Sequence, residues 1–267
     1  MAHPELANVD LDELRAQWDQ EQVKLAAQRV PVTQIPEWSP TKSEPWKGLV
    51  RVGGVDVSFL KEDPSIAVAA LVVLEFPSLK LIHQDYLQIR MEIPYMAGYL
   101  AFREVKPLQT LLDRLAQSRP GCMPQVLLVD GNGVLHPRRF GLACHLGVVA
   151  DLPTIGVAKN FLNLDDGPCL TLANTKQLGK DHLRSKGDLF RLTGKSGYTY
   201  GVGLLTSDGA SNPLFISQGH RISLEDAIPL VLSCSIHRIP EPVRSADLLS
   251  REYIRQRLAK DKDEKGD

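Results

Sequence analysis

The sequence predicts an α/β domain built on a mixed sheet, in which three antiparallel strands are followed by parallel strands and helices flank the sheet. Two observations carry this prediction. Three β-rich segments follow one another with joints so short that only antiparallel pairing is possible. Two short apolar segments without alternation then appear, separated by helical sequence, as expected of parallel strands buried on both faces. The chain of 267 residues is long enough to bury such a core.

The first three strands are expected at 49–60, 66–76 and 79–89, where turn residues join them into a meander. In the first strand Asp56 lies between Val55 and Val57, so alternation places its carboxylate on the face opposite these apolar side chains. We expect that face to stay outside the core, because an unpaired buried charge is costly.

A helix is expected within 91–119, with leucines packed on the sheet. Glu104 lies in this helix three residues before Pro107, where the helix should kink or restart. Most lone helical glutamates are simply exposed. A buried strand at 125–129 then ends on Asp130, a helix follows around 141–149, and a strand at 154–158 ends at Lys159.

The loop after Asp130 has the composition of a binding site. Gly131 and Gly133 allow the backbone to approach a ligand closely, and open α/β sheets bind ligands at the carboxyl ends of their strands. His136, Arg138 and Arg139 add donors and positive charge that suit a phosphate or a nucleic-acid backbone. The Asp-Gly-Asn-Gly turn alone is equally compatible with a plain turn, and the arginines can instead pair within the fold.

Residues 1–259 are expected to form a single domain with an N-terminal helix and an insertion at 160–200 made of short strands and loops. Prolines make 31–46 an extended connector. His220 lies between a strand and the helix capped by Ser223, a place compatible with a structural or a catalytic role. A last helix reaches Leu258, and the charged segment 260–267 is expected to be disordered.

Composition narrows the class of protein. The formal net charge of −1 means that any contact with nucleic acid must come from a local basic patch. The four cysteines form no CxxC pair, so structural zinc is not expected and the thiols should be reduced. We expect neither a signal peptide nor a transmembrane helix. The expected protein is a cytoplasmic monomer, with the nucleus as an open alternative.

The order of these elements is similar to the ribonuclease H topology, in which carboxylates on the first strand, the following helix and the fourth strand converge. Here they would be Asp56, Glu104 and Asp130. Three clustered carboxylates stay ionised only if a cation joins them, and oxygen ligands favour Mg²⁺ or Mn²⁺. His220 would orient a water or move a proton, and Lys159 would balance the phosphate charge.

The sequence also resembles one family of nucleases, endonuclease V. The matching stretches run in order from about Leu49 to Asp247 and leave the N-terminal helix and the charged tail outside. They are Gly53–Phe59, Pro94-Tyr95 with Phe102-Arg103-Glu104, Val129–Gly147, Gly156–Lys159, Gly219-His220-Arg221, and Pro240-Glu241-Pro242 with Arg244 and Asp247.

The resemblance implies a Mg²⁺- or Mn²⁺-dependent endonuclease that cuts the second phosphodiester 3′ of inosine and leaves 3′-hydroxyl and 5′-phosphate ends. It implies metal ligation by Asp56, Glu104 and Asp130, catalytic help from His220, and a phosphate contact from Lys159. Tyr95 would belong to a wedge beside the lesion. The implied substrate-binding residues also include His136 and Arg139 and a base pocket lined by Leu100, Gly131, Gly133, Gly141, Leu142 and Leu162.

One departure bears on the substrate. Bacterial members of the family usually close the wedge with a second proline, whereas this chain has Pro94-Tyr95-Met96-Ala97. Together with the long insertion, this resembles the animal members and favours inosine-containing RNA, with deoxyinosine DNA as a secondary substrate. Two alternatives remain open: another structure-specific nuclease on the same scaffold, and a protein that binds inosine or branched nucleic acid without cutting it.

Overall fold

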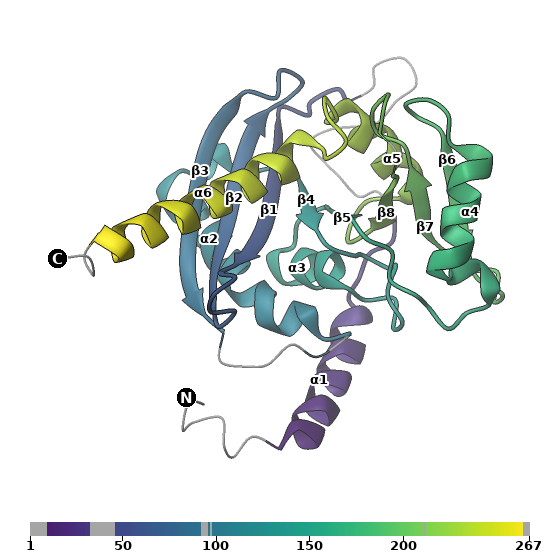
Figure 1. Ribbon diagram of the computed structural model, residues 1–267, viewed down its shortest axis with the longest axis horizontal. Helices are drawn as coiled ribbons and strands as arrows, with labels where there is room; N and C mark the ends of the chain where they lie inside the picture. The colour runs from purple at the N-terminus through teal and green to yellow at the C-terminus, as the bar shows by residue number, and fades with distance from the viewer. Residues whose placement is uncertain (1–9, 33–45, 92–95, 97, 211, 264–267) are drawn as a thin grey trace.

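The computed structural model describes residues 10–32, 46–91, 96, 98–210 and 212–263. Within these residues eight strands form one mixed sheet in the order β3-β2-β1-β4-β5-β8-β7-β6 (Figure 1). The strands are β1 (Arg51–Phe59), β2 (Ile66–Glu75), β3 (Leu81–Arg90), β4 (Val126–Asp130), β5 (Thr154–Ala158), β6 (Leu189–Thr193), β7 (Thr199–Leu204) and β8 (Leu214–Gln218). The helices are α1 (Leu11–Ala26), α2 (Leu100–Ser118), α3 (Leu142–Ala150), α4 (Leu172–His182), α5 (Leu224–Ser233) and α6 (Glu241–Asp263), with short 3-10 turns at Pro120–Cys122 and Pro168–Leu170.

The strand directions confirm the predicted fold class, a ribonuclease H-like mixed sheet. β1, β2 and β3 form the antiparallel meander, and β1 then pairs in parallel with β4, as β4 does with β5. β8 pairs antiparallel with β5. Gln218, the last residue of β8, lies opposite Ile155, the second residue of β5. The chain that leaves β8 therefore emerges at the end of the sheet where β5 begins, and this direction decides where His220 lies.

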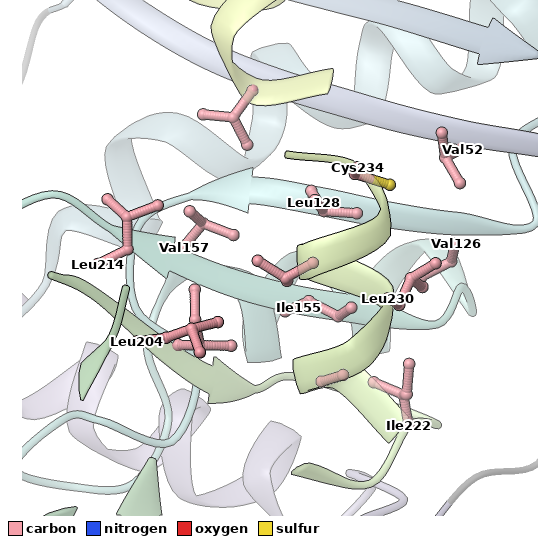
Figure 2. Close-up of a cluster of buried hydrophobic side chains, with 14 of the residues drawn as sticks. Val52, Val126, Leu128, Ile155, Val157, Leu204, Leu214, Ile222, Leu230 and Cys234 are labelled. Carbon is pink, nitrogen blue, oxygen red and sulfur yellow. The ribbon is translucent and has the colours of Figure 1, made fainter. Parts of the chain in front are cut away.

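One face of the sheet is covered by α5 and α6. β-branched and leucine side chains of the central strands pack there against α5, and Figure 2 shows Leu230 and Cys234 over Leu128 and Ile155. At the other half of the same face, Ala246 of α6 packs on β2. In Figure 1 the long helix α6 crosses β1 and β2. Burial of these apolar faces supplies the main favourable term of folding.

The opposite face is covered by α2 and α3. Leu108, Leu111 and Leu115 of α2 are buried in one cluster with Val55 of β1 and Leu127 of β4. The spacing of three and four residues between these leucines places them on one side of the helix, which explains why α2 lies along the sheet. Glu104 lies one turn before Leu108 and is also buried, with 5% of its surface exposed.

The N-terminal helix packs against this second layer. Asp10 caps α1 by accepting hydrogen bonds from the backbone N–H groups of Asp12 and Glu13. Trp18 is buried and stacks on Phe102 of α2, with the ring centroids 4.8 Å apart. The first residue of the helix, Leu11, remains 43% exposed.

Several expected details differ from the structure. The helix expected within 91–119 runs from Leu100 to Ser118 with Pro107 inside it, so it does not restart beside Glu104. The insertion contains a helix, α4, as well as β6 and β7. Its N-terminal cap is the Thr171 hydroxyl, which accepts from the Asn174 N–H, and the polar composition of α4 hid its periodicity. The last helix continues to Asp263, so the first four residues of the expected disordered tail are helical.

The segments expected to be a proline-rich connector and a charged tail lie partly outside the described residues. Most of the proline-rich connector, 33–45, lies outside them, as do residues 264–267. The part of the chain that the structure describes contains no helix both long and apolar enough to span a membrane.

Candidate active site

Asp56 lies in the middle of β1 on the face covered by α6. Its side chain is buried, with 5% of the residue exposed, so the expectation that this face keeps the charge out of the interior was wrong. The burial comes from a close approach of α6. A Cβ on Gly54 would lie 2.0 Å from the carbonyl oxygen of Pro242, so only glycine allows this contact. The hydroxyls of Ser58 and Ser250 lie 2.9 and 3.0 Å from Asp56 Oδ2.

Asp130 and Lys159 meet because their strands are parallel neighbours. Asp130 ends β4 and pairs with Val157, so Lys159, directly after β5, lies at the same end of the sheet. Its Nζ donates to Asp130 Oδ2 at 2.5 Å and to Asp247 Oδ1 at 3.3 Å. Burial alone would lower the pKa of Lys159, but the charge and hydrogen bond of Asp130 outweigh it and raise that pKa. The ammonium group is therefore held charged between two carboxylates.

Asp247, on α6, is the site residue that the sequence analysis missed as a ligand. One carboxylate oxygen from each of Asp56, Asp130 and Asp247 lies within 4.8 Å of the others. Arg251, one turn further along α6, also contacts Asp247 at 2.9 Å. The sequence carried a signal for this placement, because Val243, Ala246 and Ser250 follow one another at helical spacing of three and four residues. These three residues are buried, and Asp247 lies on the same packed side of the helix.

The three carboxylates carry more negative charge than their surroundings neutralise. Burial, followed by the hydrogen bond and charge of Asp130, raises the pKa of Asp56 to about 7. Glu104 is not one of the three that converge, but burial and then the charge of Asp56 raise its pKa to about 8. A divalent cation would relieve this repulsion, and a set of oxygen donors suits a hard cation. The ammonium group of Lys159 already lies where a positive charge is favoured.

These groups line one cleft of about 790 Å³. Its lining includes Asp56, Asp130, Lys159 and Asp247, with apolar Phe59 and Ile254 and the charged side chains of Lys61, Glu62, Arg251 and Arg255 around them. The cleft, which α6 lines along one side, is open to solvent, so a phosphodiester can reach the carboxylates. An acidic centre with a basic rim fits a polyanion whose reacting phosphate is neutralised by a bound cation.

His220 does not reach this cleft. It is buried at the opposite end of β5, where its backbone N–H donates to the Thr154 hydroxyl and its Nδ1 accepts from the Val30 N–H. Burial, then the charge of Arg221, lowers its pKa. The prediction that it assists catalysis beside the carboxylates was therefore wrong, because β8 runs antiparallel to β5 and delivers His220 to the far end.

The glycines expected in the base pocket are held by tight packing. A Cβ on Gly133 would lie 2.1 Å from the Gln218 carbonyl oxygen, and one on Gly141 would lie 2.4 Å from that of Asn132. Gly131 adopts φ +154° and faces Leu142. The structure thus brings Gly131, Gly133, Gly141 and Leu142 together around the loop after β4.

The other residues implied for substrate binding are spread over three regions. Leu100 begins α2, and Leu162 packs with the buried side chains of the insertion. Tyr95, the implied wedge residue, lies outside the described residues.

His136 and Arg139 contact the protein itself. His136 is buried with its Nε2 3.1 Å from the Gly98 carbonyl oxygen, and burial, then the charge of Arg138, lowers its pKa to about 4. Arg138 also donates to Gly98 O, at 2.7 Å. The Arg139 guanidinium lies over the Tyr198 ring of the insertion, 3.9 Å from its centroid. These two residues therefore position the loop on which the pocket glycines lie.

Carboxylates gathered at the carboxyl ends of the central strands, beside a lysine and an open cleft, define a ribonuclease H-like nuclease. Comparison with known proteins specifies the family. Residues 37–248 match the family model described as Endonuclease V. The chain is 47% identical to human Endonuclease V over 250 residues, covering 92% of this chain and 86% of the human protein. It is 48% identical to the mouse Endonuclease V over 247 residues, covering 92% and 71% of the two chains.

Solved structures agree. The catalytic domain of human Endonuclease V superposes with a TM-score of 0.85 at 47% identity, covering 92% of this chain and 98% of that one. Ciona intestinalis Endonuclease V, in complex with a 24mer DNA containing an inosine followed by a ribo-adenosine, gives a TM-score of 0.80 at 33% identity, with 91% and 99% covered. The chain belongs to the endonuclease V family.

Proposed function

We propose that this protein is a Mg²⁺-dependent endonuclease that recognises inosine in single-stranded RNA and hydrolyses the second phosphodiester bond 3′ of it. The products would carry 3′-hydroxyl and 5′-phosphate ends, and deoxyinosine-containing DNA would be a secondary substrate. The observation that carries the proposal is the convergence of Asp56, Asp130 and Asp247 within 4.8 Å in an open cleft of an endonuclease V chain.

The donor set indicates which residues would hold the metal. Asp56, Asp130 and Asp247 offer carboxylate oxygens and no nitrogen or sulfur, which favours Mg²⁺ and allows Mn²⁺ to substitute. Glu104 would complete the site from α2, since its charge already interacts with Asp56. Mg²⁺ bound there would supply Lewis-acid activation of the attacking water and stabilisation of the leaving 3′-oxygen.

The chain's own residues would position the reacting groups. Lys159 is held charged and would bind a non-bridging phosphate oxygen once the metal neutralises its carboxylate partners. Ser58 and Ser250 fix the orientation of the Asp56 carboxylate through hydrogen bonds, which keeps one of its oxygens directed at the cleft. Arg251 orients Asp247 in the same way.

The base pocket would lie in the loop between β4 and α3, where Gly131 and Leu142 face each other beside the carboxylate of Asp130. The glycines bring backbone groups close to a flipped-out hypoxanthine, which can be read through its hydrogen-bonding edge. The departure at Met96-Ala97 from the bacterial wedge supports single-stranded RNA as the main substrate, because a weaker wedge opens duplexes less well.

A cleavage assay tests the proposal. Four matched single-stranded oligonucleotides would carry inosine or adenosine at one position in RNA or in DNA, and each would be incubated with Mg²⁺, Mn²⁺ or a chelator. We expect a single metal-dependent cut one nucleotide beyond inosine, strongest in RNA. Cutting of the adenosine controls at the same rate would contradict inosine recognition, and a stronger cut in DNA would contradict the substrate preference. Retention of inosine RNA without any cut would establish a binding protein instead.

A further inference from the structure

A second groove opens on the other side of Lys159, between α4 of the insertion and the β5–β8 pair. Its volume is about 670 Å³, and we call it the basic groove. Its lining includes Lys159, Phe161, Lys176, Lys180, Arg184 and Arg238. No aspartate or glutamate is among the described residues that line it. In Figure 1 α4 stands at the edge of the molecule beside β6, away from α6.

Two lysines of the basic groove, Lys176 and Lys180, form no ion pair with any residue in the described part of the chain. Both lysines are exposed. They are four residues apart in α4, so they lie side by side on one face of the helix, an arrangement of like charges that disfavours the isolated helix. Asp181, the acidic residue of α4, instead accepts from Gln177. An anionic ligand would supply the missing neutralisation.

The two arginines give the groove its shape. Arg184 donates to the carbonyl oxygen of Leu183 at 2.9 Å and so covers the C-terminal end of α4. Arg238 donates to the carbonyl oxygens of Asn212 and Pro213, at 2.9 and 3.1 Å. A third contact of its guanidinium, to the Lys159 carbonyl oxygen at 3.3 Å, connects the floor of the groove to the cleft.

The floor of the groove is apolar and aromatic. Phe161 packs against Phe215 with the ring centroids 5.1 Å apart, and Leu172 on the rim is 43% exposed. A groove that combines cations with aromatic faces is the arrangement by which proteins follow a single-stranded nucleic acid, because phosphates pair with the cations and bases stack on the rings. A free inorganic anion would make no favourable contact with this apolar, aromatic floor.

Lys159 lines both the cleft and the basic groove, so the two hollows adjoin each other at this residue. We propose that the basic groove binds the sugar-phosphate backbone of the single-stranded substrate flanking the cut, with Lys176 and Lys180 on its phosphates. The inference rests on the proposed function for the identity of the strand, and it extends the substrate contact from the scissile phosphate to nucleotides beyond it.

The test compares two charge-matched double variants of the full chain. Lys176→Gln/Lys180→Gln removes two charges from the groove, and Lys24→Gln/Lys106→Gln removes two exposed charges from α1 and α2. Binding of single-stranded inosine RNA is measured in an Asp247→Asn background with Mg²⁺. The shortest RNA carries about 3 nucleotides on each side of inosine. In the other RNAs one flank at a time is lengthened to about 10 nucleotides, since single-strand grooves span about 4–16 nucleotides.

We expect a long flank on one side to strengthen binding to the parent protein and to the Lys24/Lys106 variant. The groove variant should lose that gain, about tenfold, while it binds the shortest RNA as tightly as the parent does. The slope of log Kd against log salt concentration should also be smaller by about 1.4 in the groove variant, because each of the two lost phosphate contacts contributes about 0.7 to that slope. With Asp247 intact, kcat at saturating short RNA should not change.

Three outcomes would overturn the inference: an unchanged flank dependence and salt slope in the groove variant, an equal loss in the Lys24/Lys106 variant, or an equal loss with the shortest RNA. Failure of the proposed function is a separate result. It would appear as absence of cutting by the unsubstituted chain, while the flank dependence of binding could still be present.

Discussion

The two ends of the β4–β5 pair both hold buried polar groups, but they treat charge in opposite ways. At the carboxyl end Asp56, Asp130 and Asp247 crowd together, with Lys159 between Asp130 and Asp247 and Arg251 beside Asp247. At the other end Thr154 and His220 form a chain of hydrogen bonds. The Thr154 hydroxyl accepts from the His220 N–H and donates to the Ala143 carbonyl oxygen at 2.7 Å.

The difference shows which end is built for chemistry. At the His220 end the charged groups nearby, Asp151 and Arg221, pair with each other at 2.8 Å, and burial lowers the pKa of the imidazole, which favours its uncharged form. At the carboxylate end burial raises the pKa values of Asp56 and Glu104 to about 7 and about 8, so the protein keeps groups there that oppose each other's ionisation. Clustered groups with strongly perturbed pKa values in a cleft are typical of functional sites. Substitutions at the two ends are therefore expected to have different consequences.

The largest effect is expected from Asp247→Asn. The substitution removes one of three converging carboxylates, and we expect kcat/KM for inosine RNA to fall on the order of 10³-fold or more, because the proposed metal would support both the attacking and the leaving oxygen. Binding should persist, since the phosphate contacts remain. Asp113→Asn, an exposed substitution on α2, is the control. Activity within threefold of the unsubstituted protein would remove Asp247 from the site.

Gly54→Ala tests how α6 reaches the carboxylate end. The added Cβ would lie 2.0 Å from backbone oxygen of Pro242, so α6 must move and carry Asp247 away from Asp56. We expect a loss of about 3 kcal/mol in the free energy of unfolding together with a large loss of activity. Gly121→Ala is the matched control, because nothing lies within 4 Å of its Cβ. Urea unfolding that is identical for the two variants would contradict the contact.

Glu104→Gln tests the repulsion at the carboxylate end in the metal-free protein. Since the pKa of Glu104 is raised to about 8, the native state binds more protons than the unfolded state up to that pH, and stability falls as pH rises. The histidines are the same in both proteins, so their titration cancels in the comparison, and between about pH 6.5 and 8 the unsubstituted protein should lose about 2 kcal/mol more than the variant.

Thermal unfolding in a chelator at several pH values measures this difference. Glu21→Gln, an exposed substitution on α1, should leave the pH dependence unchanged. If the stability of Glu104→Gln and of the unsubstituted protein depends on pH in the same way, ionisation of the Glu104 carboxyl group does not destabilise the folded state. Added Mg²⁺ should reduce the slope of the unsubstituted protein, because the cation favours the ionised carboxylates.

The smallest effect on activity is expected from His220→Ala. The substitution leaves the Val30 N–H without its acceptor and should lower the free energy of unfolding by about 1–3 kcal/mol. Because His220 lies at the far end of β5, kcat should stay within about threefold. His237→Ala, at an exposed position, is the control. A hundredfold loss of kcat with unchanged stability would restore His220 to catalysis.

The path from sequence to structure was reliable where a signal was local. Alternation around Asp56 and the unbroken apolar run before Asp130 predicted β1 and β4, and the short joints between the first three strands predicted their antiparallel pairing. Local signals failed for α4, whose mean composition is polar and whose cap is a single threonine. They also misjudged the burial of Asp56, because the helix that covers it comes almost 200 residues later in the chain.

The sequence by itself determined the fold class, the resemblance to the endonuclease V family, and the placement of two carboxylates and a lysine at the ends of parallel strands. These follow from side-chain periodicity and from parallel pairing, which aligns strand ends. Only the tertiary structure decided that Asp247 joins Asp56 and Asp130, that His220 lies at the other end, and that α4 forms a basic groove beside Lys159. The physical reason is that the direction of β8 and the packing of α6 on Gly54 are set by contacts between distant segments, which no local pattern encodes.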